Sequence, residues 1–264
     1  MFRHTWDGRR QLTLIGTGIT DYLEPPIEPA YRDEVVQLLS DHLATFADWD
    51  VCNWQDLDAS TPFGALGVDG CLRVMPCEDV PCTQISLVRD FDAYWQERGP
   101  DLRRNVRRYR TKAEREGALD FEVYDRASPE VLSAFVRLHA RRWQLCGESG
   151  TLAANGSAGF LEEIANRFDA ARLLRLFTLL FKNEIVAGII SFPFKHRVFS
   201  YLSAFDPQYE RFGFGNAILY ESLRYCCREG WRTWDFLRGD EGYKLHWGAE
   251  RKEKRRIVII RSCS

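Results

Sequence analysis

Three consecutive apolar runs restrict the folds open to this 264-residue chain more than any other feature. They span residues 173–181, 184–194 and 198–205 and are rich in β-branched and aromatic residues. Lys182-Asn183 separates the first two runs, and Lys195-His196 lies between the second and the third. Pairs of this kind between such runs form the tight turns of β-hairpins. The segment therefore predicts a three-stranded antiparallel meander.

The meander is followed by a turn, a helix and another strand. The turn covers residues 206–215, the helix 216–229 and the strand 233–237, with Gly230 as the helix stop. A helix that joins two strands in this way is a β-α-β crossover, and its combination with a meander is typical of a mixed α/β fold. We expect five further strands or strand-like runs at residues 11–16, 70–76, 83–88, 119–124 and 256–261. We expect four further helices at residues 30–47, 90–117, 128–143 and 160–169.

Composition excludes several classes of protein. Charged residues make up 28% of the chain and the formal net charge is -2, which argues against general affinity for nucleic acids, DNA included, and against a disordered chain. The eight cysteines form no C-x-x-C pair, which indicates reduced thiols. We find no secretory signal, no apolar run long enough to span a bilayer, no H-E-x-x-H motif and no G-x-S-x-G motif. We therefore expect a soluble, cytoplasmic protein without a metal and without a hydrolase serine.

The turn before the crossover helix contains the sequence RFGFGN. Glycines at 213 and 215 let the backbone turn sharply and leave amide N–H groups free at a helix start. Those donors and the helix dipole suit a phosphate or a pyrophosphate. A G-x-G pair alone is equally consistent with a plain tight turn, but its place between a meander and a crossover helix favours the phosphate loop. The candidate phosphate-binding residues are Arg211, Phe212, Gly213, Phe214, Gly215 and Asn216.

Several ordered motifs resemble one known family. The C-terminal ones are FDPQYERFGFGNAILYESLRYCCREGW and WDFLRGDEGYKLHWG. They are preceded by LRRNVRRYRTKAEREGALDFEVY and FVRLHARRWQLCGESG, and further upstream by LIGTGITDYLEP. These segments resemble the BioF2-like (CelD-type) acetyltransferase domain, a branch of the GNAT superfamily related to the FemABX aminoacyltransferases. The likeness covers most of the chain.

The resemblance implies a GNAT-like acyl-CoA N-acyltransferase fold, α/β (α+β), with a mixed, mostly antiparallel sheet flanked by helices. It divides the chain into residues 1–89, a partial and shortened N-terminal GNAT-like half, and residues 90–264, the acyltransferase domain. It implies acetyl-CoA or another acyl-CoA as co-substrate. One position departs from the family: Glu210 stands where many GNAT proteins carry Gln or Arg.

Three residues are candidates for catalysis. Lys244 follows a strand that should end beside the thioester, where a cation would stabilise an oxyanion; the alternative is a surface lysine paired with a neighbouring acid. Asp235 lies inside an apolar strand and would act as a base or as an orienting group; a structural ion pair explains it equally well. His139 lies on the apolar stripe of its helix, either as a core histidine or facing the substrate.

The resemblance also suggests residues that contact the acceptor. Arg142 and Trp143 follow His139 in LHARRW, on a helix that borders the acceptor groove in such proteins. We add Tyr201 as a core or groove aromatic, Arg238 as a candidate partner of Asp235, and Tyr243 beside Lys244.

The only strong charge cluster lies between Arg103 and Arg115, where one helix carries seven cations. A solvated helix face is the usual explanation, and an anionic partner is the functional one. Three functions therefore stay open. The first is acyl transfer from acyl-CoA to a small-molecule or glycan-precursor acceptor of the cell envelope or of exopolysaccharide. The second is FemABX-like transfer from aminoacyl-transfer RNA, and the third is a non-catalytic accessory role.

Overall fold

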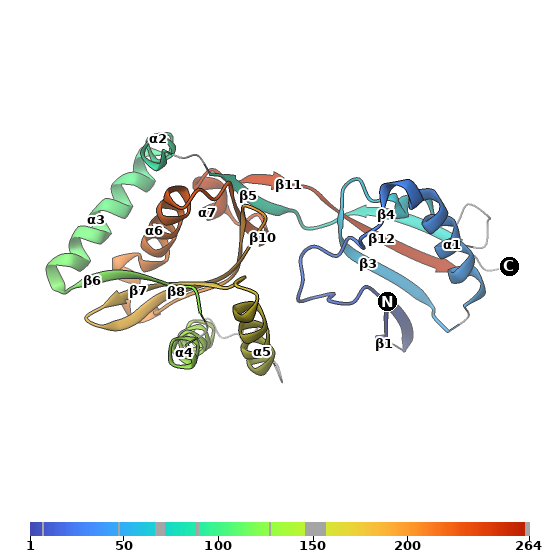
Figure 1. Ribbon diagram of the computed structural model, residues 1–264, viewed down its shortest axis with the longest axis horizontal. Helices are drawn as coiled ribbons and strands as arrows, with labels where there is room; N and C mark the ends of the chain where they lie inside the picture. Colours follow the sequence, from blue (N-terminus) through green and yellow to red (C-terminus); the bar gives the residue numbers. More distant parts are fainter. Residues whose placement is uncertain are drawn as a thin grey trace. The chain divides into compact units, whose positions relative to one another are not determined.

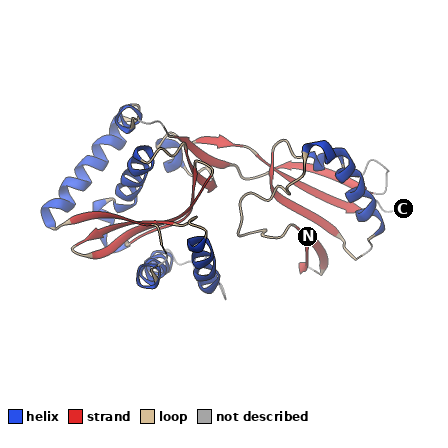
Figure 2. Ribbon diagram, viewed as in Figure 1, coloured by secondary structure: helices blue, strands red, loops and turns tan. Residues whose placement is uncertain are grey.

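The computed structural model describes residues 1–6, 8–46, 48–66, 72–87, 90–126, 128–145 and 157–261, with the backbone alone for 2–6, 143–145 and 157–158 (Figures 1 and 2). The chain forms two compact units. The first comprises Met1–Thr83, Arg238–Asp240 and Arg251–Ser264, and the second comprises Gln84–Leu237 and Glu241–Glu250. The sequence predicts a single boundary, between residues 89 and 90. In the structure, Arg238–Asp240 and Arg251–Ser264 also belong to the first unit, although they lie after that boundary.

The first unit is built on a five-stranded sheet in the order β1-β2-β3-β12-β4. The strands are β1 (Phe2–Trp6), β2 (Arg9–Thr13), β3 (Val51–Asp58), β4 (Leu72–Glu78) and β12 (Lys254–Arg261). β12 is antiparallel to both β3 and β4, so it lies inside the sheet although it comes from the far end of the sequence. Its Ile257 and Ile259 are fully buried against Trp54 and Leu57 of β3 and against Leu43 of helix α1 (Arg32–Thr45).

Strand β3 contains a bulge. Trp54 pairs with Ile257 and Leu57 pairs with Arg255, so two residues of β3 oppose only Arg256 of β12. One of these two residues is Asp56, whose φ of 60° is in the left-handed region that a non-glycine residue rarely adopts. The bulge therefore redirects a carboxylate into the interior of the first unit, where Asp56 has no exposed surface.

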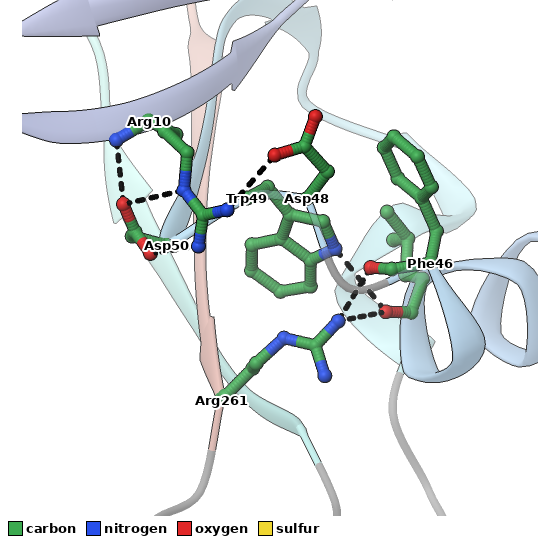
Figure 3. A network of polar contacts seen from close by, with 7 residues as sticks. Arg10, Phe46, Asp48, Trp49, Asp50 and Arg261 are labelled. Carbon is green, nitrogen blue, oxygen red and sulfur yellow. Dashed lines mark hydrogen bonds and ion pairs between the residues drawn. The ribbon is translucent and has the colours of Figure 1, made fainter.

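A polar network fastens the segment between α1 and β3 to the neighbouring strands (Figure 3). The Arg10 guanidinium of β2 donates to Asp48 at 2.8 Å and to Asp50 at 2.6 Å. Arg261 of β12 donates to the backbone carbonyl of Phe46, and its guanidinium lies 4.9 Å from the centroid of the Trp49 ring. Because β2 and β12 flank β3 on opposite sides, these two arginines fix where β3 begins.

The second unit is built on a seven-stranded sheet in the order β11-β5-β10-β9-β8-β7-β6, in which β5 and β11 include residues assigned to the first unit. Its strands are β5 (Cys82–Ser86), β6 (Leu119–Tyr124), β7 (Arg175–Phe181), β8 (Glu184–Phe194), β9 (Arg197–Phe205), β10 (Thr233–Arg238) and β11 (Glu250–Lys252). β7, β8 and β9 form the expected antiparallel meander. Both residues of each predicted turn have positive φ, as required in a tight hairpin turn of this hand.

Helices cover both faces of this sheet (Figure 1). They are α2 (Phe91–Gln96), α3 (Pro100–Glu116), α4 (Pro129–Leu145), α5 (Ser157–Ala170), α6 (Phe214–Arg228) and α7 (Gly242–His246). α2, α3 and α6 share one buried core with the sheet, and α4 and α5 share another. Three short 3-10 helices complete the structure: Pro29–Tyr31, Pro62–Ala65 and Pro207–Phe212. No helix in the described ranges is both long and apolar enough to cross a membrane.

The sequence-based prediction of one helix over residues 90–117 is wrong. The chain there forms two helices, α2 and α3, which are interrupted at Gly99-Pro100. Proline cannot continue a helix from the preceding turn, but it is well suited to the first position of a new one. α7 and β11 were also not anticipated, because both are shorter than a periodic pattern can reveal.

Candidate functional site

The sheet of the second unit opens between β9 and β10. These strands are parallel and pair only through Arg197, Val198 and Phe199 of β9, opposite Thr233–Asp235 of β10. Beyond Phe199, β9 continues for six residues and stays paired with β8 on its other side. Along that stretch, alternate backbone N–H and C=O groups of β9 point away from β8, toward a side where no strand pairing is found among the described residues.

A cavity of about 240 Å³ lies at this opening. Its walls come from the second half of β9, from the start of α6, from Phe236 of β10 and from Tyr243 of α7. Its lining is predominantly apolar, as is usual for a small-molecule site. The lining residues are Arg142, Ile189, Ser200, Ser203, Ala204, Phe205, Glu210, Gly213, Phe214, Gly215, Asn216, Ile218, Leu219, Phe236 and Tyr243.

The glycine turn forms one wall of this cavity. Gly213 has a φ of 58° and is the N-cap of α6. No hydrogen bond is described for the backbone N–H of Phe214 or of Gly215, the first two residues of that helix. Two free donors at the positive end of a 15-residue helix make this wall suited to an anion.

The glycines also serve the packing of the protein itself. A Cβ at Gly213 would lie 2.8 Å from the ring of Tyr109 of α3, and a Cβ at Gly215 would lie 3.2 Å from the ring of Phe205. Both alternatives weighed from the sequence are therefore compatible with the structure: the turn needs glycine for close packing, and its residues line a cavity.

Several polar side chains line this predominantly apolar cavity. The Arg142 guanidinium donates to the carbonyl of Ser203 at 3.1 Å and lies 4.6 Å from the centroid of the Phe205 ring. Glu210 is exposed, and no hydrogen bond or ion pair of its carboxylate is described within the second unit. Tyr243 packs edge-on against Phe236, and desolvation followed by the nearby negative charge of Glu241 raises the pKa of its phenol to about 12.

The other predicted phosphate-binding residues have structural contacts. Arg211 forms an ion pair with Glu116 at 2.8 Å, and Phe212 is completely buried in the core. Asn216 lines the cavity, but its side-chain carbonyl accepts a hydrogen bond from the indole of Trp247 at 3.1 Å. The part of the predicted loop that offers free groups to a ligand is thus the backbone of Phe214 and Gly215.

The carboxylate of Asp235 forms an ion pair and a hydrogen bond within the second unit. Its side chain is fully buried, with one carboxylate oxygen 2.9 Å from the Arg197 guanidinium and the other accepting from the backbone N–H of Leu237 at 2.8 Å. Leu237 has a φ of 61°, so this hydrogen bond stabilises an irregular end of β10. Since alternate residues of a strand face opposite sides, Asp235 points away from the face on which Phe236 lines the cavity. These contacts match the ion-pair alternative.

Lys244 is buried rather than exposed. Its ammonium is 2.8 Å from the Glu241 carboxylate and 5.8 Å from the centroid of the Phe236 ring, and 4% of the residue is accessible. It is not among the residues that line the cavity, whereas Phe236 and Tyr243 on either side of it are. The lysine therefore contacts the ring that forms the cavity wall, and its ion pair with Glu241 matches the structural alternative.

His139 is 2% exposed on α4 and packs 6.4 Å from the Phe135 ring centroid. Burial, with a smaller effect from the Arg142 charge, lowers the pKa of its imidazole to about 4. The ring is therefore neutral at physiological pH, as expected of a core histidine. Within the described lining, α4 contributes Arg142, one turn further along the helix.

The remaining predicted substrate contacts are dispersed. Tyr201 packs 5.5 Å from the Phe192 ring, in the core that α4 and α5 share with the sheet. Arg238 belongs to the first unit, where its guanidinium is 3.8 Å from Asp56. The side chain of Trp143 lies outside the described residues.

Sequence reasoning missed two polar residues of the cavity, Ser200 and Ser203, and noted Glu210 only as a departure from the family. The serines interrupt an otherwise apolar strand, and that interruption was the available signal. The sequence did not indicate that β9 and β10 separate part of the way along, because each strand has the mostly apolar sequence of an ordinary buried strand. A metal site was not expected, and no group of three potential ligands is found among the described residues.

Comparison with solved structures shows the fold. FemX superimposes with a TM-score of 0.62 at 12% identity, covering 89% of this chain and 79% of FemX. L-PGS from Bacillus licheniformis gives a TM-score of 0.60 at 13% identity, covering 98% of this chain and 79% of the other. A tandem GNAT protein from the clavulanic acid biosynthesis pathway gives 0.50 at 11% identity, covering 90% and 74%. At these identities the likeness concerns the fold alone.

Comparison of sequences identifies the domain. No curated protein matches the chain significantly. A family profile described as "Acetyltransferase (GNAT) domain" matches residues 100–245, more than half of the chain, from α3 through the glycine turn to Lys244 and Leu245 of α7. The mixed sheet flanked by helices agrees with this match: the chain belongs to the GNAT acetyltransferase family.

Proposed function

We propose that the second unit transfers an acyl group from acyl-CoA, with acetyl-CoA as the simplest donor, to an amine or hydroxyl of a small acceptor. The observation that carries the proposal is the cavity at the opening between β9 and β10, bordered by the free amides at the start of α6. We propose a sugar-like precursor of the cell envelope or of exopolysaccharide as the acceptor class, on the strength of the sequence resemblance.

The cavity offers suitable partners for each part of the donor. An extended chain with amide groups, such as the pantetheine arm of coenzyme A, can pair with an open strand edge as an added strand would. The second half of β9 has such an edge. The backbone N–H groups of Phe214 and Gly215 would hold a pyrophosphate oxygen, and Arg142 is a cation that lines the same cavity.

When bound, the thioester supplies an activated carbonyl and a thiol leaving group. Tyr243 lines the cavity and its phenol is protonated at neutral pH, so it can donate a proton to the departing thiol, although its pKa of about 12 makes it a weak acid. Arg142 is held in place by Ser203, so it can orient the acceptor or the donor without a conformational search. We retain an oxyanion role for Lys244, a base role for Asp235 and a substrate-facing role for His139 as proposals.

Titration calorimetry with acetyl-CoA tests donor binding. Ser203 is exposed and lines the cavity, so Ser203→Trp should fill the space without unfolding the protein and should weaken binding at least tenfold. Ser86→Trp is the matched control, since Ser86 is an exposed serine of β5 that does not line the cavity. Absence of binding at millimolar acetyl-CoA in the unaltered protein would refute an acetyl-CoA donor.

A specific observation also favours a second candidate, transfer from aminoacyl-transfer RNA. Glu210 places a carboxylate without a described partner at the cavity, where it would repel a pyrophosphate but would attract the ammonium group of an aminoacyl donor. Close to the glycine turn, Lys112 of α3 lies 5.5 Å from the Phe212 ring centroid. Four exposed cations of α3 have no described acidic partner and could contact phosphates: Arg107, Arg108, Lys112 and Arg115.

Glu210→Gln separates the two candidates. It should improve acyl-CoA binding if the donor is a coenzyme A thioester, because a repelling charge is removed. It should weaken use of an aminoacyl donor if the carboxylate binds its ammonium group. Charge reversal at Arg107 and Arg108 should reduce only the second activity, measured as transfer from charged transfer RNA.

A further inference from the structure

The first unit contains a separate groove with a volume of about 610 Å³, which no part of the proposed acyl transfer uses. It lies between α1, the proline-containing segment before it, and Trp54 and Phe63 beneath them. The volume is within the range of about 300–1,000 Å³ that is usual for small-molecule sites. All the residues that line it belong to the first unit.

Helix α1 explains why the groove is apolar. Its sequence RDEVVQLLSDHLAT places apolar residues on two stripes. Val36, Leu39 and Leu43 pack into the core of the first unit. Val35 and Leu38 lie one residue before Val36 and Leu39, so they form a second stripe that the sheet does not cover, and Leu38 is 61% exposed. An apolar stripe left open along a groove is typical of a binding surface.

Trp54 supplies a second, independent sign of a ligand. It is 1% exposed on β3 and lines the groove, yet its indole Nε1 has no hydrogen-bond acceptor within the described part of the chain. A buried N–H without an acceptor loses its hydrogen bond to water and gains none in return, so such donors are seldom left unsatisfied. A ligand with a hydroxyl, ether or carbonyl oxygen would supply the missing acceptor, provided that its binding moves a neighbouring side chain and uncovers the buried Nε1 atom.

The charged groups that line the groove indicate which head group an apolar ligand should carry. Glu28 and Glu34 line the groove, and neither has an ion pair described in the first unit. The described lining contains no lysine or arginine, and the positive group it does contain is the α-amino group of Met1. Both glutamates are exposed, and two carboxylates against one α-amino group give the rim of the groove a net negative charge. A fatty acid would be repelled there, whereas an ammonium group would be attracted.

We propose that this groove binds a small amphipathic amine: an apolar body along the second stripe of α1, an oxygen acceptor for Trp54 Nε1, and an ammonium group at Glu28 and Glu34. This site is distinct from the acyl-transfer cavity. It has its own lining residues, and its occupancy does not depend on whether the second unit uses acyl-CoA.

Calorimetric titration of the full chain with three eight-carbon probes tests the proposal: 2-(octylamino)ethanol, 1-octanol and octanoate. The amine should bind at least tenfold more tightly than octanoate, and octanol should lie between them. Glu28→Gln combined with Glu34→Gln should abolish the preference for the amine while retaining octanol binding. Trp54→Phe keeps an aromatic ring but removes the N–H donor, and should weaken the amino alcohol about five- to tenfold.

Leu38→Glu should prevent binding of all three probes. Ile15→Glu is its control, because Ile15 is an apolar residue of the same unit, 75% exposed and not part of the groove. Equal or tighter binding of octanoate would overturn the proposal, and so would amine binding that survives Leu38→Glu. A dimer, measured by light scattering, that Leu38→Glu dissociates would instead assign the groove to a second copy of the chain. Acetyl-CoA binding, followed in the same samples, reports on the second unit separately.

Discussion

Replacement of Asp56 by Asn should change how the stability of the first unit depends on pH. Asp56 is fully buried in the β3 bulge, and neither of its carboxylate oxygens has a hydrogen bond in the described structure. The nearest cation is the Arg238 guanidinium at 3.8 Å. Asn is close in size and tolerates the left-handed φ of this position at least as well. The backbone N–H of residue 56 would keep its 2.7 Å hydrogen bond to Asp79, so the substitution mainly removes a buried charge.

The size of the effect follows from the pKa. Burial raises the pKa of Asp56 from 3.8 to about 6; Arg238 and Lys254 oppose the shift, and the negative charges of Asp79 and Asp21 add to it. The folded state then binds this proton more tightly than the unfolded chain does. Asp56 therefore costs little below about pH 4, and its cost to stability grows as pH rises to about 6 and above. Two pKa units correspond to about 3 kcal/mol.

Urea unfolding of the unaltered protein and of Asp56→Asn between pH 4 and pH 8 measures how the cost of the Asp56 charge depends on pH. The free energy of unfolding of Asp56→Asn, relative to the unaltered protein, should increase by about 3 kcal/mol across the range, with most of the rise between pH 4 and 6. All other titrating groups are shared, so their contributions cancel in the difference. A difference that stays constant with pH would refute the reasoning, and would mean that Arg238 closes onto the carboxylate and holds it ionised.

Three further perturbations follow from the site. Gly213→Ala should lower the urea midpoint by the equivalent of about 1–3 kcal/mol, and by more than Gly230→Ala, since both have positive φ but only residue 213 would collide with a neighbouring ring. Burial lowers the pKa of His139 to about 4, so the stability it contributes should be full above about pH 6.5 and lost as pH falls through 4; His139→Gln should remove that part of the acid titration. Tyr243→Phe should reduce kcat about 100-fold with little change in the KM for acyl-CoA, and an unchanged kcat would exclude the phenol as proton donor.

Local patterns predicted the part of the fold that local contacts determine. The meander strand β8 has the predicted limits, and its two flanking turns have the φ values that two-residue hairpins need. The crossover helix α6 begins two residues earlier than predicted, at Phe214. Each of these features depends on a side-chain period or on a turn residue that lies within the segment itself.

Strand pairings and side-chain contacts between residues far apart in the sequence could not be predicted from local patterns. The strand at residues 254–261 was expected, but its insertion between β3 and β4 depends on partners about 180–200 residues away in the sequence. The partner of Asp235 was expected among nearby groups such as Arg238, whereas the structure pairs it with Arg197 of the adjacent strand. The candidate cavity arises where two strands stop pairing, and strand pairing is not encoded in either strand alone.

The position of β12 has a consequence for synthesis of the protein. The β1–β4 region leaves the ribosome before β12 does, so its core lacks Ile257 and Ile259 until the second unit has also been synthesised. Domains generally fold as units during translation. The second unit can therefore fold before β12 is available to pair with β3 and β4. During that interval both strands present unpaired edges, so the nascent first unit is the part of this protein that most needs a chaperone.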